Sequence, residues 1–184
     1  MRLLAAPLLL VTALLAASGT AGAEAAVPEY DVKAAFLYNF TKFVQWPPSA
    51  FHDDRSSLRL CVLGEDPFGE SLETVAEEAV DGRTLTVLRA GWMNDPAGCQ
   101  ILFISRSESQ RLPEILAAVR GAPVLTVADV DGFLEKGGII NFILEGSKVR
   151  FEINQEGADQ AGLKISSKLL RLATRVVAGA RQGP

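Results

Sequence analysis

Short apolar runs alternate along this chain with stretches of helical periodicity, and this alternation restricts the possible folds more than any other feature. Strands are predicted over Leu58–Leu63, Thr84–Leu88, Gln100–Ile104 and Val124–Val127. Helices are predicted from the Gly64–Gly69 turn to about Ala79, and over Glu108–Arg120. The run Gln100–Ile104 is almost wholly apolar, which is typical of a strand covered on both faces. The alternation therefore predicts an α/β domain with a mostly parallel central sheet and helices on both faces.

The pattern changes after the fourth run. Ile139–Leu144 and Lys148–Ile153 are separated by Glu145-Gly146-Ser147, which predicts a β-hairpin. A last helix is expected to begin at Ser166-Ser167, both good capping residues. Its helical spacing is carried by Leu169, Leu172, Ala173 and Val176. The prediction is one three-layer domain over residues 24–184 that ends in a β-hairpin plus a helix.

An aromatic segment precedes these elements. Val32, Phe36, Phe40 and Phe43 recur at steps of three and four residues, which places them on one helix face. Pro47-Pro48 is expected to end this helix. Asn39 falls within the apolar stripe on a helical wheel, so we expect a buried amide with hydrogen-bond partners. This face either packs on the core or stays partly open for a partner.

The first residues indicate export from the cytoplasm. Arg2 precedes an apolar run over Leu3–Ala17, and Ala21-Gly22-Ala23 has the small-x-small pattern of a cleavage site. Residues 1–23 are therefore predicted to be a secretory signal peptide. Cleavage after Ala25 is a second option. The alternative is a membrane anchor, but a spanning helix needs about 20 apolar residues and this run is shorter.

Export bears on the two cysteines, Cys61 and Cys99. In an oxidising compartment an even pair indicates a disulfide, whereas in the cytosol both would be buried thiols. In a flavodoxin-like strand order, the first and third strands are neighbours. Cys61 lies in the first predicted strand and Cys99 opens the third. Adjacent strands lie about 4.8 Å apart, which is within the reach of a disulfide.

Composition and motifs argue against several functions. The formal net charge of −4 does not favour a nucleic-acid partner, because phosphate contact requires clustered Lys and Arg. His52 is the one histidine and sits in a polar loop, and no nucleophile-elbow motif occurs. One histidine and two paired cysteines cannot form a zinc site. We therefore expect no catalytic set, no metal and no cofactor.

The segment Gly64–Gly69 follows a strand and opens a helix, which is where phosphate loops occur. It lacks the Walker and dinucleotide spacings, so a capping turn is the simpler interpretation and a small-ligand contact is the alternative. A ligand pocket at the carboxyl ends of the strands would be formed by neighbouring loops. Its predicted residues are Gly64, Glu65, Phe68, Ser105 and Arg106.

Sequence motifs from the aromatic helix to the last helix resemble those of the YfiR family. They are Lys33–Phe40 with Trp46-Pro47, Leu63–Gly69, Gly137–Phe142, Val149–Asn154 and Ala161–Ala173. Each motif alone is weakly specific, but they occur together and in the family's order over essentially the whole chain after the leader.

The resemblance implies a periplasmic regulator that binds the periplasmic region of an inner-membrane diguanylate cyclase and represses it. Loss of such a repressor raises cyclic di-GMP and favours biofilm growth. It also implies a homodimer, and a founding member with two disulfides. Cys61 and Cys99 match one of these bridges. The predicted strands over Ile139–Ile153 contain no cysteine for the other, so redox switching by that second bridge is not expected here.

Three functional hypotheses follow from these features. The first is a repressor that acts by direct contact, the second is a small-ligand sensing module for another membrane sensor, and the third is an enzyme built from dispersed acids. We expect no enzymatic activity. The first and last helices have more apolar residues than one buried face requires, so some of these residues are candidates for contact with a partner. The alternative is that all of them pack in the core. They are Leu37, Tyr38, Leu170 and Val177.

Overall fold

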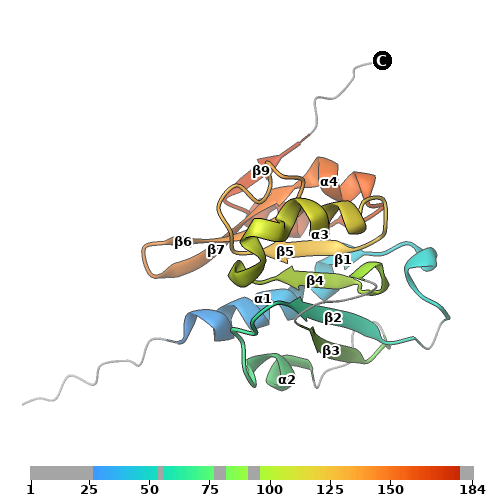
Figure 1. The fold of residues 1–184 in the computed structure, drawn as a ribbon, viewed down its shortest axis with the longest axis horizontal. Coiled ribbons are helices and arrows are strands. Elements are labelled where there is room, and N and C mark those ends of the chain that lie inside the picture. Colours follow the sequence, from blue (N-terminus) through green and yellow to red (C-terminus); the bar gives the residue numbers. More distant parts are fainter. Residues whose placement is uncertain (1–26, 54–55, 77–81, 91–95, 179–184) are drawn as a thin grey trace, which may run out of the picture.

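The computed structural model describes residues 27–53, 56–76, 82–90 and 96–178. The predicted signal peptide and the predicted helix end near Ala79 lie outside these ranges. Figure 1 shows a twisted sheet at the centre of the domain, with strand order β3-β2-β4-β5-β6-β7-β9. The described ranges thus contain the predicted α/β architecture with a mostly parallel sheet.

The parallel half of the sheet confirms the predicted neighbours. β2 (Leu58–Leu63) pairs with both β3 (Leu85–Ala90) and β4 (Ile101–Ile104), and β5 (Leu125–Ala128) pairs with β4. The strand predicted first therefore lies beside the strand predicted third. Cys61 is in register with Leu102, which brings the amino end of β4 close to the middle of β2.

The other half of the sheet begins with the predicted hairpin. β6 (Ile140–Glu145) and β7 (Lys148–Asn154) pair antiparallel, and β6 joins β5 in parallel. Helix α4 (Gln155–Gln160) follows and was not predicted from the sequence. Asn154 caps it by accepting a hydrogen bond from the Gly157 N–H.

The prediction of one long C-terminal helix is wrong. Helix α5 (Ser167–Leu172) begins where expected, capped by Ser166, but it ends after six residues. β9 (Arg175–Val177) follows and pairs in parallel with β7. Val176 has helical spacing, but two features favour a strand here. They are the open edge of β7 and the β-branched side chains at 176 and 177.

Helix α1 (Glu29–Phe43) is confirmed, but its buried face is rotated from the expected one. Lys33 and Leu37 are fully buried, whereas Val32 and Phe36 are half-buried at the side of the interface. The expectation for Asn39 is wrong, because this residue is exposed. An apolar stripe alone did not reveal that a lysine occupies the centre of the face.

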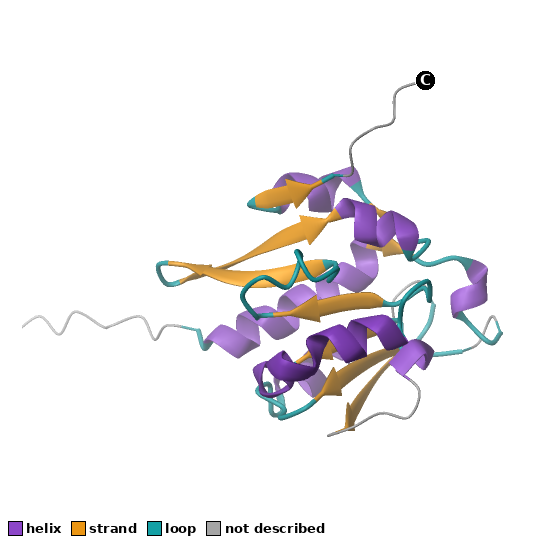
Figure 2. Cartoon of the chain, turned by 45° about the horizontal axis from the view of Figure 1, so that its top comes forward, coloured by secondary structure: helices purple, strands orange, loops and turns teal. Residues whose placement is uncertain are grey.

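Helices cover both faces of the sheet (Figure 2). Alternate residues of β2 illustrate the two cores: Leu60 and Val62 pack with α1, whereas Cys61 and Leu63 pack with α3 (Leu112–Ala118). Helix α2 (Ser71–Ala76) and α5 also contribute to the α1 core. The remaining short elements are β1 (Val44–Gln45), η1 (Pro48–Ala50), η2 (Pro96–Gly98), η3 (Arg106–Arg111) and β8 (Lys164–Ile165), of which β1 and β8 pair antiparallel.

Candidate functional site

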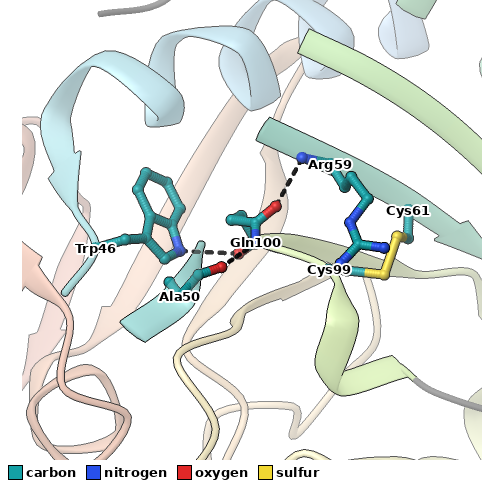
Figure 3. The surroundings of a disulfide bond; sticks show 6 residues. All are labelled: Trp46, Ala50, Arg59, Cys61, Cys99 and Gln100. Carbon is teal, nitrogen blue, oxygen red and sulfur yellow. Dashed lines mark hydrogen bonds between the residues drawn. A yellow bond between two sulfur atoms is a disulfide. The ribbon is translucent and has the colours of Figure 1, made fainter. Parts of the chain in front are cut away.

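The predicted disulfide is present and lies in the α3 core. Cys61 and Cys99 are bonded, with Cα atoms 6.0 Å apart, and both residues are buried. The bridge links β2 to the segment that enters β4 (Figure 3). It therefore fastens two neighbouring core strands, as the strand order predicted.

A hydrogen-bonded glutamine lies next to this bridge. The side chain of Gln100 accepts a hydrogen bond from the Arg59 N–H at 2.8 Å and donates one to the carbonyl of Ala50 at 2.6 Å. Its backbone carbonyl accepts one from Trp46 Nε1 at 3.1 Å (Figure 3). These bonds attach the segment after α1 to the same strand ends that the disulfide joins.

The predicted ligand-binding residues gather only in part at the carboxyl ends of the strands. Gly64 and Ser105 follow β2 and β4, and the Ser105 N–H donates to the carbonyl of Leu63 at 3.0 Å. The Glu65 N–H donates to Ser107 Oγ at 3.0 Å. A Cβ on Gly64 would lie 2.4 Å from that same Oγ, so the two loops are in direct contact and leave no space between them.

Phe68 is placed elsewhere. Its ring is buried in the α1 core and packs edge-on against Phe103 and Tyr30. Arg106, in contrast, borders an open cavity of about 340 Å³. The other residues that line this cavity are Ser109, Asp129, Val130 and Asp131. Of the five predicted residues, Arg106 is the one that this cavity contains.

Beside this cavity lies a charge cluster, buried at Lys33 and Asp129, that we call the Asp129 cluster: Glu29, Tyr30, Lys33, Arg106 and Asp129. Asp129 directly follows β5, and its side chain is 1% exposed. One carboxylate oxygen accepts hydrogen bonds from Lys33 Nζ at 2.6 Å and from Tyr30 Oη at 2.8 Å. Lys33 also pairs with Glu29 one helical turn earlier. The cluster thus joins α1 to the carboxyl end of the central strand β5.

Arg106 closes the cluster on the solvent side. Its Nε donates to the backbone carbonyl of Asp129 at 3.0 Å and lies 3.3 Å from the carboxylate Oδ1. Within the described residues, that Oδ1 is buried and accepts no hydrogen bond. The Asp129 carboxylate raises the pKa of the Arg106 guanidinium. Burial, followed by the hydrogen bond to Asp129, raises the pKa of Tyr30 to about 12, so the phenol is a neutral donor at physiological pH.

This arrangement is chemically a balanced ion-pair network. The two cations Lys33 and Arg106 face the two carboxylates Glu29 and Asp129, and Tyr30 supplies a further hydrogen bond. Lys33 and Asp129 are both buried, so each requires the other, because an unpaired buried charge is costly. It holds α1 in place and presents Arg106 to the cavity.

Sequence reasoning missed most of this cluster. Lys33 was not recognised as buried because only apolar residues were used to define the helix face. Asp129 follows a strand in a loop, where turn chemistry ordinarily explains an aspartate. The spacing of Glu29 and Lys33, one helical turn apart, is a signal that could have shown a paired lysine on this face.

The predicted partner-facing residues lie at different depths. Leu37 and Tyr38 belong to the buried core, and Leu170 is half-buried against it. Val177 is half-buried in β9 and packs against the α3 core. The strongly exposed apolar side chains of the C-terminal segment are instead Leu172, at 56% exposure, and Val176, at 38%.

Two further features bear on function. Among the residues that the structure describes, no three histidine, cysteine, aspartate or glutamate side chains come together in a way that could hold a metal ion. Within the same ranges, no helix combines the length and the apolar character that crossing a membrane requires.

The fold resembles that of a solved structure with low sequence identity. A conserved domain protein from Vibrio cholerae matches with a TM-score of 0.56 and 13% identity, over 82% of this chain and 60% of that one. This chain therefore spans about 60% of the length of the Vibrio protein. The ABC domain from Streptococcus pneumoniae, solved with L-Trp, matches with a TM-score of 0.48 and 12% identity, over 65% of this chain and 55% of that one.

A family comparison gives a more specific result. The model of the family described as YfiR/HmsC-like matches residues 30–174. The match begins at Tyr30 in α1 and ends one residue before β9, so it includes the disulfide, strands β1 to β8 and every member of the Asp129 cluster except Glu29. With a match over more than half of its length, this chain belongs to the YfiR/HmsC-like family.

Proposed function

We propose that this protein is a periplasmic repressor that binds the periplasmic region of an inner-membrane diguanylate cyclase and limits cyclic di-GMP synthesis by direct contact. The observation that carries the proposal is the family match over residues 30–174. Members of this family regulate diguanylate cyclases, and the family is generally non-enzymatic. The periplasmic location, the target and repression by direct contact are the parts that we propose.

Two features support a site of action outside the cytoplasm. The buried disulfide between Cys61 and Cys99 requires an oxidising compartment to persist. Residues 1–23 have the pattern of a secretory signal peptide. A periplasmic location would place the domain beside the extracytoplasmic part of a membrane cyclase.

The C-terminal segment supports a contact surface. Leu172 and Val176 expose apolar side chains, and β9 is the last strand in the sheet order. Within the described residues, the outer edge of β9 therefore pairs with no further strand, and edge backbone groups can accept a strand from another chain. We propose that this segment, which includes Leu170 and Val177, faces the cyclase, and that the chain works as a homodimer.

A capture experiment tests this proposal. The protein should bind the periplasmic region of a membrane diguanylate cyclase from the same cell, and deletion of its gene should raise cyclic di-GMP. Leu172→Lys and Val176→Lys should both weaken capture, whereas Leu144→Lys, an exposed position on the β6–β7 hairpin, is the control. Unchanged cyclic di-GMP together with no capture would refute the repressor assignment.

A second candidate function is supported by the cavity beside Arg106. This cavity has a volume of about 340 Å³ and is next to the buried Asp129 carboxylate, so a small ligand bound there would touch the network that holds α1. Such a ligand would make the protein a sensing module. A thermal-shift screen that finds no stabilising compound, or only compounds that stabilise Arg106→Gln equally, would count against this function.

A further inference from the structure

A second cavity lies at the opposite end of the strands from the Asp129 cluster. It also has a volume of about 340 Å³ and is formed by the C-terminal end of α3, the start of β5, the turn before β6, and α4. Figure 1 shows α3 lying over β5, with α4 nearby at the side of β9. Because β5 and β6 run parallel and both begin here, the cavity is at their amino ends.

The charges around this cavity have one sign. Arg120 and Lys136 line it, and none of its lining residues is acidic, although the whole chain has a net charge of −4. Among the residues that the structure describes, Arg120 makes no ion pair. Lys136 donates to the carbonyl of Asp131 at 3.3 Å and, within the same described ranges, forms no ion pair. This local excess of positive charge favours an anion.

The polar group inside the cavity is also a donor. Thr126 is buried at the start of β5, and its Oγ1 accepts a hydrogen bond from the Ile139 N–H at 3.1 Å. The hydroxyl proton of Thr126 has no acceptor within the described residues and can be donated into the cavity. A ligand that offers only acceptor atoms therefore matches all three groups: Thr126, Arg120 and Lys136.

Apart from the exposed Gln160, the remaining side chains of the wall are apolar. Val119, Val124 and Ile139 line the cavity and are themselves buried. The volume is at the small end of the range for ligand sites, about 300–1,000 Å³. A ligand with an acceptor group and a short apolar body would match the cavity, because the acceptor group would lie at the cationic rim and the body against the apolar wall. The planar guanidinium of Arg120 suits a carboxylate in particular.

We propose that this cavity binds a small organic monocarboxylate with a short hydrocarbon body. The carboxylate lies between Arg120 and Lys136, and the hydrocarbon part contacts Val119, Val124 and Ile139. The site does not depend on the repressor assignment, and it is distinct from the cavity that Arg106 borders.

The test uses the full exported chain with its disulfide intact, and hexanoate as the probe. Hexan-1-ol, which has the same hydrocarbon body without the charge, is the matched ligand control. Titration calorimetry gives the affinity, and amide chemical shifts locate the site. We expect hexanoate to bind more tightly than hexan-1-ol and to shift the amide signals of Gly121 and Gly137, which line the cavity.

Four variants complete the experiment. Arg120→Gln and Lys136→Gln should each weaken hexanoate binding by up to about fivefold, as expected for partly exposed ion pairs. Lys148→Gln, an exposed position on the β6–β7 hairpin, should leave the affinity unchanged. Ala161→Leu, at a half-buried position against the core, should fill part of the cavity and weaken hexanoate binding, with amide spectra showing that the variant is folded. No hexanoate binding, equal binding of hexan-1-ol, equal affinity of all three charge variants, or shifts confined to the Arg106 cavity would each overturn the proposal.

Discussion

Replacing Lys33 with methionine is the most direct test of the Asp129 cluster. The side chains of Lys33 and Asp129 are each 1% exposed, and the ammonium lies 2.6 Å from the carboxylate. Removing one partner of a buried ion pair costs about 3–5 kcal/mol, because the other charge stays buried without compensation. Methionine keeps the apolar stem, and Tyr30 and Arg106 still contact Asp129. We therefore expect Lys33→Met to lower the free energy of unfolding by about 3 kcal/mol, the lower end of that range.

Urea unfolding of a double-mutant cycle measures this coupling. Asp129→Asn removes the carboxylate charge, so the double variant Lys33→Met with Asp129→Asn no longer contains an unpaired buried anion. It should be more stable than the sum of the two single effects predicts. Lys148→Met, at an exposed hairpin position, is the control and should cost almost nothing. Single effects that add to within about 0.5 kcal/mol would refute the coupling.

Three further predictions concern the bridge, the phenol and the glutamine. Replacing Cys61 and Cys99 by alanine should lower the free energy of unfolding by about 4 kcal/mol, because the bridge closes a loop across a sequence separation of 38 residues; an unchanged urea midpoint would contradict this. Burial raises the pKa of Tyr30 from 10 to about 12, so its contribution to stability is complete below pH 10 and is lost as the pH rises to 12. Chemical denaturation should show a smaller loss over this interval for Tyr30→Phe than for the wild type, and equal losses would contradict the assignment. Gln100→Ala leaves two backbone groups unpaired and should cost about 2–4 kcal/mol in the same urea assay, whereas the exposed Gln160→Ala should cost almost nothing.

The parallel strands of the core were predictable because each is marked by a short apolar run in its own segment of the sequence. Leu58–Leu63 and Gln100–Ile104 are apolar runs of strand length, and the chain must cross between them through helices. This connectivity favours a small number of strand orders, and one of them places Cys61 near Cys99. The disulfide could therefore be predicted together with the strand order.

The C-terminal segment shows where local signals fail. Leu169, Leu172 and Val176 have helical spacing, and the capping serine at 166 is used as expected. Yet the Thr174 N–H donates to the carbonyl of Phe151 at 2.9 Å, and the chain continues as β9 along the edge of β7. A free strand edge is a property of the assembled sheet, so periodicity within the segment could not reveal it.

The candidate site also combines features that are visible within short segments and features that arise only in the assembled fold. The sequence by itself determined the neighbours among the parallel core strands, the family and the bridge, because each of these depends on patterns within short segments or on connectivity. Only the tertiary structure decided that Lys33 is buried and that Asp129 is its partner. These two residues are separated by 96 positions, and the sequence contains no local sign of their contact. Folding buries a helix lysine and a loop aspartate next to each other. They form an ion pair because a charge that is removed from water is stable only beside a counter-charge.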